Sequence, residues 1–251
     1  ISIGTFFLTW FFGSLYISRL SDSIGRRPGI LICLLGAIAG YAIATVSIIS
    51  HSYILLVLSR AITGFTAGAQ PIAAAAMIDL AKNEQESARN LGFITVGMSF
   101  GLIIGPIIGG VFSDNDLLGN FASLQLPFFV GGLLCLAGFC LIYFGFKDIK
   151  TEPIPLEINP FLVFQLLADA FKRRSVRRVA MAYFPYMLCV LGLYVFVSAN
   201  LAVRFGYGAI GSSFAMFLMG IGLAASSSML VEPLNVRFSK RVIMFACTVL
   251  F

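Results

Sequence analysis

Long apolar runs separated by short polar segments dominate this chain of 251 residues. Most complete runs hold about 20 to 25 residues, the length of a helix that crosses a bilayer. Backbone polar groups in hydrocarbon must bond within the chain, and the alternating strands of about ten residues that build a membrane barrel are absent. The pattern predicts an all-α membrane protein with seven spans and part of an eighth. The expected spans are 1–17, 30–49, 53–77, 91–112, 126–146, 180–203, 210–231 and 242 onward.

Composition agrees with a membrane protein and excludes a water-soluble domain. Charged residues make up 11% of the chain, against about 25% in soluble domains, and hydrophobic residues make up 59%. The five cysteines lie in apolar runs without CxxC spacing, so we expect them to pack, with no disulfide framework and no metal site. The chain opens on Ile1 inside one apolar run and stops inside another, so we expect a piece of a longer protein.

The basic residues sort by side of the membrane. Fifteen of the 17 lie in alternate connections, while the other connections hold only Arg204. The positive-inside rule therefore places the basic connections in the cytoplasm of a multi-pass plasma membrane protein, a bacterial inner membrane protein if the source is bacterial. The net charge of +6 reports topology, and we expect no binding of nucleic acid. The expected cytoplasmic loops are 18–29, 80–90, 147–179 and 232–241.

The longest connection, 147–179, separates an expected N-terminal bundle, 1–146, from the start of a C-terminal bundle, 180–251. Apolar residues from Phe161 to Phe171 recur at helical spacing before the cluster KRRSVRR. An amphipathic helix beside anionic lipid of the inner leaflet is the preferred interpretation, and a site for a protein partner is the alternative. A weak repeat at an offset of 214 residues is consistent with two related bundles.

The first basic connection, SRLSDSIGRRP, has the composition of a latch between helices. Gly25 permits a tight turn, Asp22 can face a positive helix N-terminus, and Arg26 and Arg27 can bind a carboxylate or a helix C-terminus. A plain basic loop that only fixes orientation is the alternative.

This connection resembles the inner loop signature GxxxDRxGRR of the major facilitator superfamily, with Ser18 in place of the first Gly and Ser23 in place of a basic residue. The resemblance implies that the loop docks two helix bundles together when a transporter faces outward. It also implies that Asp79, at the end of the third span, pairs with Arg26 or Arg27. Helix capping or solvation is the other interpretation of Asp79.

Arg60 is the only charged residue inside any expected span, about 10 Å beyond Tyr53 along the helix. Such burial costs at least about 2.5 kcal/mol, which favours a functional cavity, with snorkelling to the outer interface as the alternative. The segment resembles the superfamily's fourth-helix motif RxxQGxxxA, whose arginine is linked to proton coupling, but has Thr63 for Gln and Gly68 for Ala. Gln70 is either a cavity amide or a hydrogen-bond partner of a neighbouring helix.

The fourth span, GMSFGLIIGPIIGG, has glycines every four residues and therefore a smooth stripe, with a proline that removes one hydrogen bond. It resembles the antiporter signature GxxxGPxxGG in the superfamily's fifth helix, found in drug and tetracycline exporters. Ordinary helix packing or a sugar-uptake protein is the alternative. The motif residues are Gly97, Gly101, Gly105, Pro106, Gly109 and Gly110.

Together these resemblances identify the chain as a drug:H+ antiporter or tetracycline-resistance-like member of the superfamily, running from its second to its ninth helix. They imply two pseudo-symmetric bundles and a monomer that exports small organic molecules or drugs by alternating access. The coupling partner would be a proton gradient, without a cofactor. A sugar or metabolite symporter or facilitator is the alternative, and a seven-helix receptor is the alternative from another class.

Two further patterns bear on chemistry. No cluster of nucleophile, base and orienting group is visible, so we expect no enzyme activity. No Asp or Glu lies inside any span, although proton relays commonly use one. Three explanations stay open: a carboxylate on another helix, modulation by Arg60 of an unseen site, or coupling to something other than protons.

Overall fold

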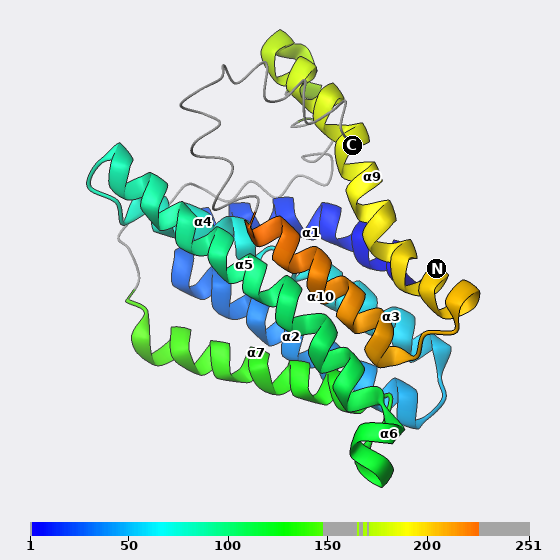
Figure 1. The fold of residues 1–251 in the computed structure, drawn as a ribbon. Coiled ribbons are helices and arrows are strands. Elements are labelled where there is room, and N and C mark those ends of the chain that lie inside the picture. The colour runs from blue at the N-terminus through cyan, green and yellow to red at the C-terminus, as the bar shows by residue number, and fades with distance from the viewer. Residues whose placement is uncertain (1, 148–164, 166–167, 170, 226–251) are drawn as a thin grey trace. The chain divides into compact units, whose positions relative to one another are not determined.

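A computed structural model of the chain describes residues 2–147, 165, 168–169 and 171–225 (Figure 1). The described residues form helices and turns and no strand, which confirms the all-α fold. Most of the linker helix expected from 159 onward, the cytoplasmic loop 232–241 and the span from 242 lie outside the described residues. The helices are α1 (Ser2–Ile24), α2 (Arg26–Ile49), α3 (Tyr53–Phe65), α4 (Ala69–Asp79), α5 (Glu84–Ser113), α6 (Asn115–Leu118), η1 (Gly119–Phe121), α7 (Leu126–Gly145), α9 (Arg174–Phe205) and α10 (Ala209–Ala225).

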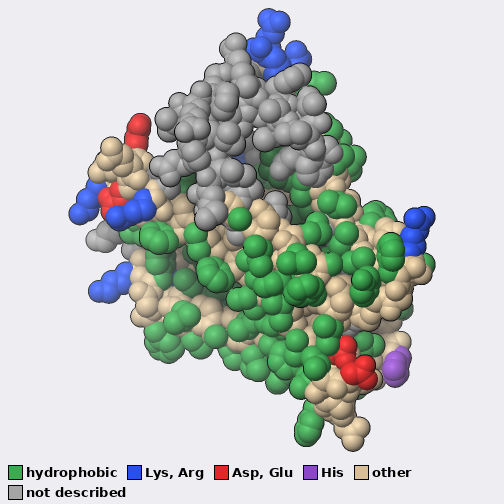
Figure 2. All heavy atoms as spheres, viewed as in Figure 1, with side chains coloured by type: hydrophobic (Ala, Val, Ile, Leu, Met, Phe, Trp, Pro, Cys, Tyr) green, Lys and Arg blue, Asp and Glu red, His purple; other side chains and the backbone are tan. Residues whose placement is uncertain are grey.

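Five segments of the described chain are long and apolar enough to cross a membrane, which confirms a multi-pass membrane protein. Helix α10 contains a shorter apolar segment, and α1 is not among the five. Apolar side chains spread over the face that Figure 2 shows. The five segments are Arg26–Ile49, Tyr53–Asp79, Glu84–Ser113, Leu126–Gly145 and Val176–Leu193.

The chain divides into two compact units. The first contains Ile1–Thr95 and Asn115–Gln165, and the second contains Val96–Asp114 and Leu166–Phe251. In the first unit α1, α2, α3, α4 and α7 pack together, and in the second α9 packs against α10. The division of the whole protein into bundles at 147–179 stays a prediction.

Helix α2 packs against both α3 and α7 in the first unit, and each contact contains a glycine. An added Cβ at Gly40 would come within 2.3 Å of the Thr63 side chain on α3. On the other face, Tyr41 of α2 lies against Gly131 of α7, 3.2 Å from the position of an added Cβ. Successive helical residues are turned by about 100°, so Gly40 and its neighbour Tyr41 address different helices.

Helices α1 and α3 approach until their backbones touch. A Cβ added to Gly13 would lie 1.9 Å from the carbonyl oxygen of Phe65, and one added to Gly64 would lie 2.4 Å from that of Phe6. Small residues allow this approach in membrane proteins, where lipid offers no hydrophobic drive for helices to associate. The buried centre nearby consists of Ile17, Ile30, Cys33 and Ile72.

The expected third span is two helices rather than one. Helix α3 ends at Phe65 and α4 begins at Ala69, with a turn between them. Pro71 explains the break, because it has no N–H to donate to Ala67 and its ring clashes with that carbonyl group. Within the turn the Ala67 N–H donates to the Gly64 carbonyl, 3.1 Å away.

Two other helices extend beyond the apolar runs that predicted them. Helix α5 begins at Glu84, where the Asn83 side chain caps the helix by accepting from the Glu86 N–H at 2.8 Å. Helix α9 begins at Arg174, inside the basic cluster, and ends at Phe205, where Gly206 with a φ of 67° caps the helix in the left-handed region.

Candidate functional site

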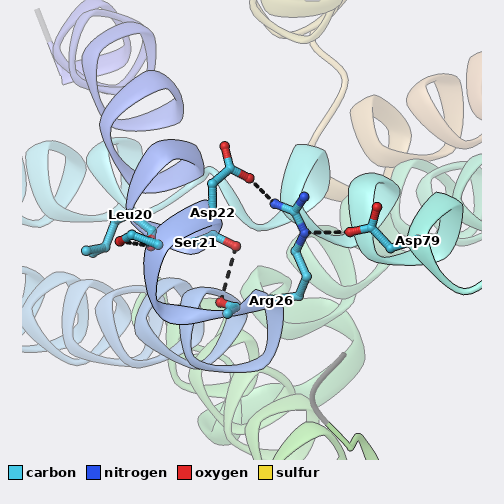
Figure 3. A network of polar contacts seen from close by, with 7 residues as sticks. Leu20, Ser21, Asp22, Arg26 and Asp79 are labelled. Carbon is cyan, nitrogen blue, oxygen red and sulfur yellow. Dashed lines mark hydrogen bonds and ion pairs between the residues drawn. The ribbon is translucent and has the colours of Figure 1, made fainter. Parts of the chain in front are cut away.

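Arg26 joins three elements at one end of the first unit. Its guanidinium forms an ion pair with Asp22 of α1, and its Nε lies 2.9 Å from an Asp79 carboxylate oxygen at the end of α4 (Figure 3). The Arg26 side chain is 14% exposed, and those of Asp22 and Asp79 are 34% and 27% exposed. The structure thus brings Asp22, Arg26 and Asp79 together, and it pairs Asp79 with Arg26 rather than with Arg27.

The charges of this cluster oppose the dipoles of their own helices. Arg26 is the first residue of α2, where the helix end is positive, and Asp79 is the last residue of α4, where the helix end is negative. Each side chain alone would destabilise its helix end. Their mutual contact offsets both effects, and the planar guanidinium can serve two carboxylates at once because its N–H groups point in different directions.

A single residue turns the chain between α1 and α2. Gly25 has φ 106° and ψ 159°, a conformation that side chains with a Cβ rarely adopt. The turn therefore brings together the end of α1, which carries Asp22, and the start of α2, which carries Arg26. The 18–29 connection is therefore helical on both sides of Gly25, and Arg26 and Arg27 open α2.

Ser21 and Gly29 fix the same turn, and the sequence analysis did not identify them. Ser21 is fully buried, and its hydroxyl donates to the Gly25 carbonyl at 3.4 Å. A Cβ on Gly29 would lie 2.6 Å from the Ser21 Cβ, so only glycine fits there without displacement. In the sequence, the small residues Ser21, Gly25 and Gly29 recur every four residues. That spacing could have identified Ser21 and Gly29 as part of the turn.

Arg27 contacts α7. It donates a hydrogen bond to the Tyr143 carbonyl, and its guanidinium lies 5.4 Å from the centre of the Tyr143 ring. Tyr143 belongs to the last turn of α7, where carbonyl groups lack helical partners and a cation is favourable. Arg27 therefore caps α7.

Arg60 lies half-buried on α3, with its guanidinium 5.1 Å from the centre of the Phe128 ring. Phe128 is in the first turn of α7, so this contact joins α3 to α7. Among the described residues, Arg60 forms no ion pair. Thr63, which replaces the motif's Gln, donates to the Ser59 and Arg60 carbonyls and so binds backbone.

Gln70 lies on the other side of the break that interrupts the third span. It is the second residue of α4, directly before Pro71, and its side chain is exposed. Arg60 is on α3, so the turn at Thr66–Gly68 separates the two expected pathway residues along the chain. A broken helix in a transporter exposes backbone groups where they can line a cavity.

The glycine motif lies on α5, which continues through Pro106. A Cβ added at four of its glycines would meet no described heavy atom within 4 Å, whereas Gly110 is buried. The packing function of the stripe stays a prediction. The four open glycines are Gly97, Gly101, Gly105 and Gly109.

The second unit contains an apolar cavity of about 280 Å³. Helix α10 contacts α5 nearby, where a Cβ on Gly220 would lie 2.9 Å from the Ile103 side chain. No group of three His, Cys, Asp or Glu side chains that could hold a metal ion occurs in the described part of the chain. The cavity is lined by Ile107 and Val111 of α5 and by Ile210, Ser213, Phe214 and Phe217 of α10.

Comparison with known proteins decides the family. The sequence profile of the Major Facilitator Superfamily matches residues 1–251. The chain belongs to the Major Facilitator Superfamily. This match confirms the expected resemblance over the whole length of the chain. It also confirms the expected superfamily fold.

Relatives include tetracycline resistance proteins. The chain is 30% identical to the class B protein of Escherichia coli over 136 residues, 54% of this chain and 31% of that protein. It is 29% identical to the class C protein of Escherichia coli over 232 residues, 90% of this chain and 54% of that protein. The chain spans between about a quarter and about half of the length of the curated relatives it matches.

A second group of relatives is eukaryotic. Human major facilitator superfamily domain-containing protein 10 is 28% identical over 223 residues, 81% of this chain and 46% of that protein. The crystal structure of the human organic anion transporter MFSD10 (TETRAN) matches with a TM-score of 0.69 and 23% identity, over 91% of this chain and 55% of that one. This likeness shows the fold.

Proposed function

We propose that the whole protein is a secondary transporter that exports small organic molecules or drugs in exchange for protons, by alternating access. The observation that carries the proposal is the glycine and proline run from Gly97 to Gly110 on α5, in a chain of this superfamily related to tetracycline resistance proteins. Membership of the superfamily also favours transport over enzyme activity. The protein would act as a monomer in the plasma membrane with its basic loops in the cytoplasm.

The charge cluster supports a conformational latch. Arg26 links the end of α4 to the turn between α1 and α2 through Asp22 and Asp79, and in this proposal these helices move together. Gly25 sets the turn and Arg27 fixes α7 to the same end. A rigid first bundle is what rocking of two bundles requires.

Arg60 and Gln70 are the proposed residues of the substrate or proton pathway. Arg60 has no carboxylate partner within any span of this chain, and among the described residues its guanidinium lies over the Phe128 ring. A cation in this position can stabilise a negative charge on a substrate or on a proton-carrying carboxylate elsewhere in the whole protein. Because the human relative MFSD10 is an organic anion transporter, an acidic substrate is a natural probe.

An apolar organic substrate is favoured over a sugar by the cavity of the second unit. Its lining between Ile107 and Phe217 is apolar except for Ser213. Sugars need several polar groups that converge on their hydroxyls, whereas an apolar cavity accepts the rings of a drug. The sugar symporter or facilitator is therefore the weaker alternative.

Transport by the full-length protein in proteoliposomes tests the proposal. With tetracycline and an aromatic carboxylate as probes, we expect movement to depend on an imposed pH gradient and to carry protons in the opposite direction. Gly105→Val should abolish gradient-driven movement, while Gly192→Val, at another helix position with an open Cβ, should retain it. Movement that ignores the gradient would overturn antiport, and movement of sugars alone would favour the alternative.

A further inference from the structure

A dense basic segment opens α9. Positions 172–178, KRRSVRR, hold five cations in seven residues, and the apolar segment Val176–Leu193 begins within them. Arg174, Arg177 and Arg178 are exposed. They lie just before the expected span 180–203 begins. Topology alone requires basic residues on this side, but not on one particular face of the helix.

The three arginines share one face of α9. Their spacing of three and four residues places Arg174, Arg177 and Arg178 within about 100° around the helix axis. Like charges at this spacing repel, and all three lie in the positive first turns of the helix. An anion bound between them would offset both effects.

The chain supplies little compensation within its described part. The first turn of α9 contains no acidic residue, and the N-cap residue Arg173 forms no side-chain cap. Asp169 pairs with Lys172 at 2.8 Å, and the described carboxylates form no ion pair with the three arginines. Arg178 donates only to the Arg174 carbonyl, at 3.4 Å.

Exposed apolar side chains continue the same face into the span. Met181, Phe184 and Leu188 lie seven, ten and fourteen residues after Arg174, which places them on the arginine side of the helix. They are 67%, 70% and 62% exposed, respectively. The face therefore has a cationic head next to an apolar strip about 10 Å long, at 1.5 Å per residue from Met181 to Leu188.

We propose that this face of α9 binds one anionic phospholipid of the inner leaflet. Arg174, Arg177 and Arg178 bind the headgroup phosphate, and an acyl chain lies along Met181 and Leu188. Guanidinium groups and phosphate form charge-assisted, often bidentate hydrogen bonds, and an amphiphile matches both halves of the face. The site does not depend on the transport activity proposed above.

Lipid binding to the full-length protein tests this site. The protein in detergent micelles is titrated with phosphatidylglycerol or phosphatidylcholine, and bound lipid is counted by native mass spectrometry. R174Q/R177Q/R178Q should weaken phosphatidylglycerol binding roughly 100-fold, at about five-fold for each arginine. K82Q/R89Q/K147Q removes three cations from other expected cytoplasmic positions and should change binding less than about three-fold.

Further variants distinguish binding of a lipid headgroup from binding of free phosphate, and they control for misfolding. M181S/L188S should weaken phosphatidylglycerol binding but leave binding of inorganic phosphate unchanged. R174K/R177K/R178K keeps the charges and should retain binding within a few-fold. Equal loss in the two neutralised triple variants would overturn the proposal, as would equal binding of phosphatidylcholine. Inorganic phosphate that competes as strongly as the lipid would also overturn it.

Discussion

Replacing Arg26 with Gln should loosen the first unit, because one guanidinium serves two carboxylates. Partly exposed ion pairs contribute up to about 1 kcal/mol each, and the side chains of this cluster are 14% to 34% exposed. The substitution also removes a cation from the positive end of α2, which regains about 0.5 kcal/mol. The expected loss of stability is therefore about 1.5 kcal/mol, or roughly 12-fold in the unfolding equilibrium.

A double-mutant cycle isolates the contact between α2 and α4. Arg26→Gln, Asp79→Asn and the double variant of the full-length protein are unfolded with sodium dodecyl sulfate in mixed micelles and followed by circular dichroism. We expect a coupling energy of about 1 kcal/mol for the pair.

The matched control is the ion pair of Arg89 with Glu86. It is 3.9 Å long, with an Arg89 side chain that is 70% exposed, so its coupling energy should stay below about 0.3 kcal/mol. If the coupling between Arg26 and Asp79 is no larger than this control, Arg26 does not hold α4, and the latch loses its structural basis.

The sequence predicted the fold class because hydrophobicity is a local property of the chain. Seven of the expected spans correspond to described helices or pairs of helices. The ends of these helices were less predictable, because an apolar run marks the membrane and not the helix. Helix α1 continues past the expected end at Ile17 to Ile24, since nothing before Gly25 breaks it.

The break within the third span escaped prediction for a related reason. No charged residue interrupts the chain at Thr66–Gly68, so the run from Tyr53 reads as one span. The backbone geometry that Pro71 imposes is invisible to apolar periodicity. A proline breaks a helix in its interior but is accommodated in the first turn. The sequence therefore shows Pro71 without showing where one helix ends and the next begins.

Contacts between distant segments were the least predictable part of the candidate site. Arg26 and Asp79 are 53 residues apart, and only the resemblance to a family suggested their pairing. Arg27 and Tyr143 are 116 residues apart, and no local pattern indicated that contact. Arg60 could be identified as an unusual charge, but its position against Phe128 follows from the packing of α3 on its neighbours.

Two further substitutions test the packing that holds this site. Gly13→Ala would place a Cβ 1.9 Å from the Phe65 carbonyl oxygen, so α1 and α3 must separate, at about 1 to 3 kcal/mol. Gly4→Ala, with no neighbour within 4 Å, should be neutral in the same unfolding assay, and equal effects would contradict the close approach. Arg27→Gln should speed amide hydrogen exchange in the last turn of α7, because the Tyr143 carbonyl loses its cationic donor and the turn frays more readily. Exchange that is unchanged there would mean that packing alone holds α7, and that Arg27 is only a topological charge.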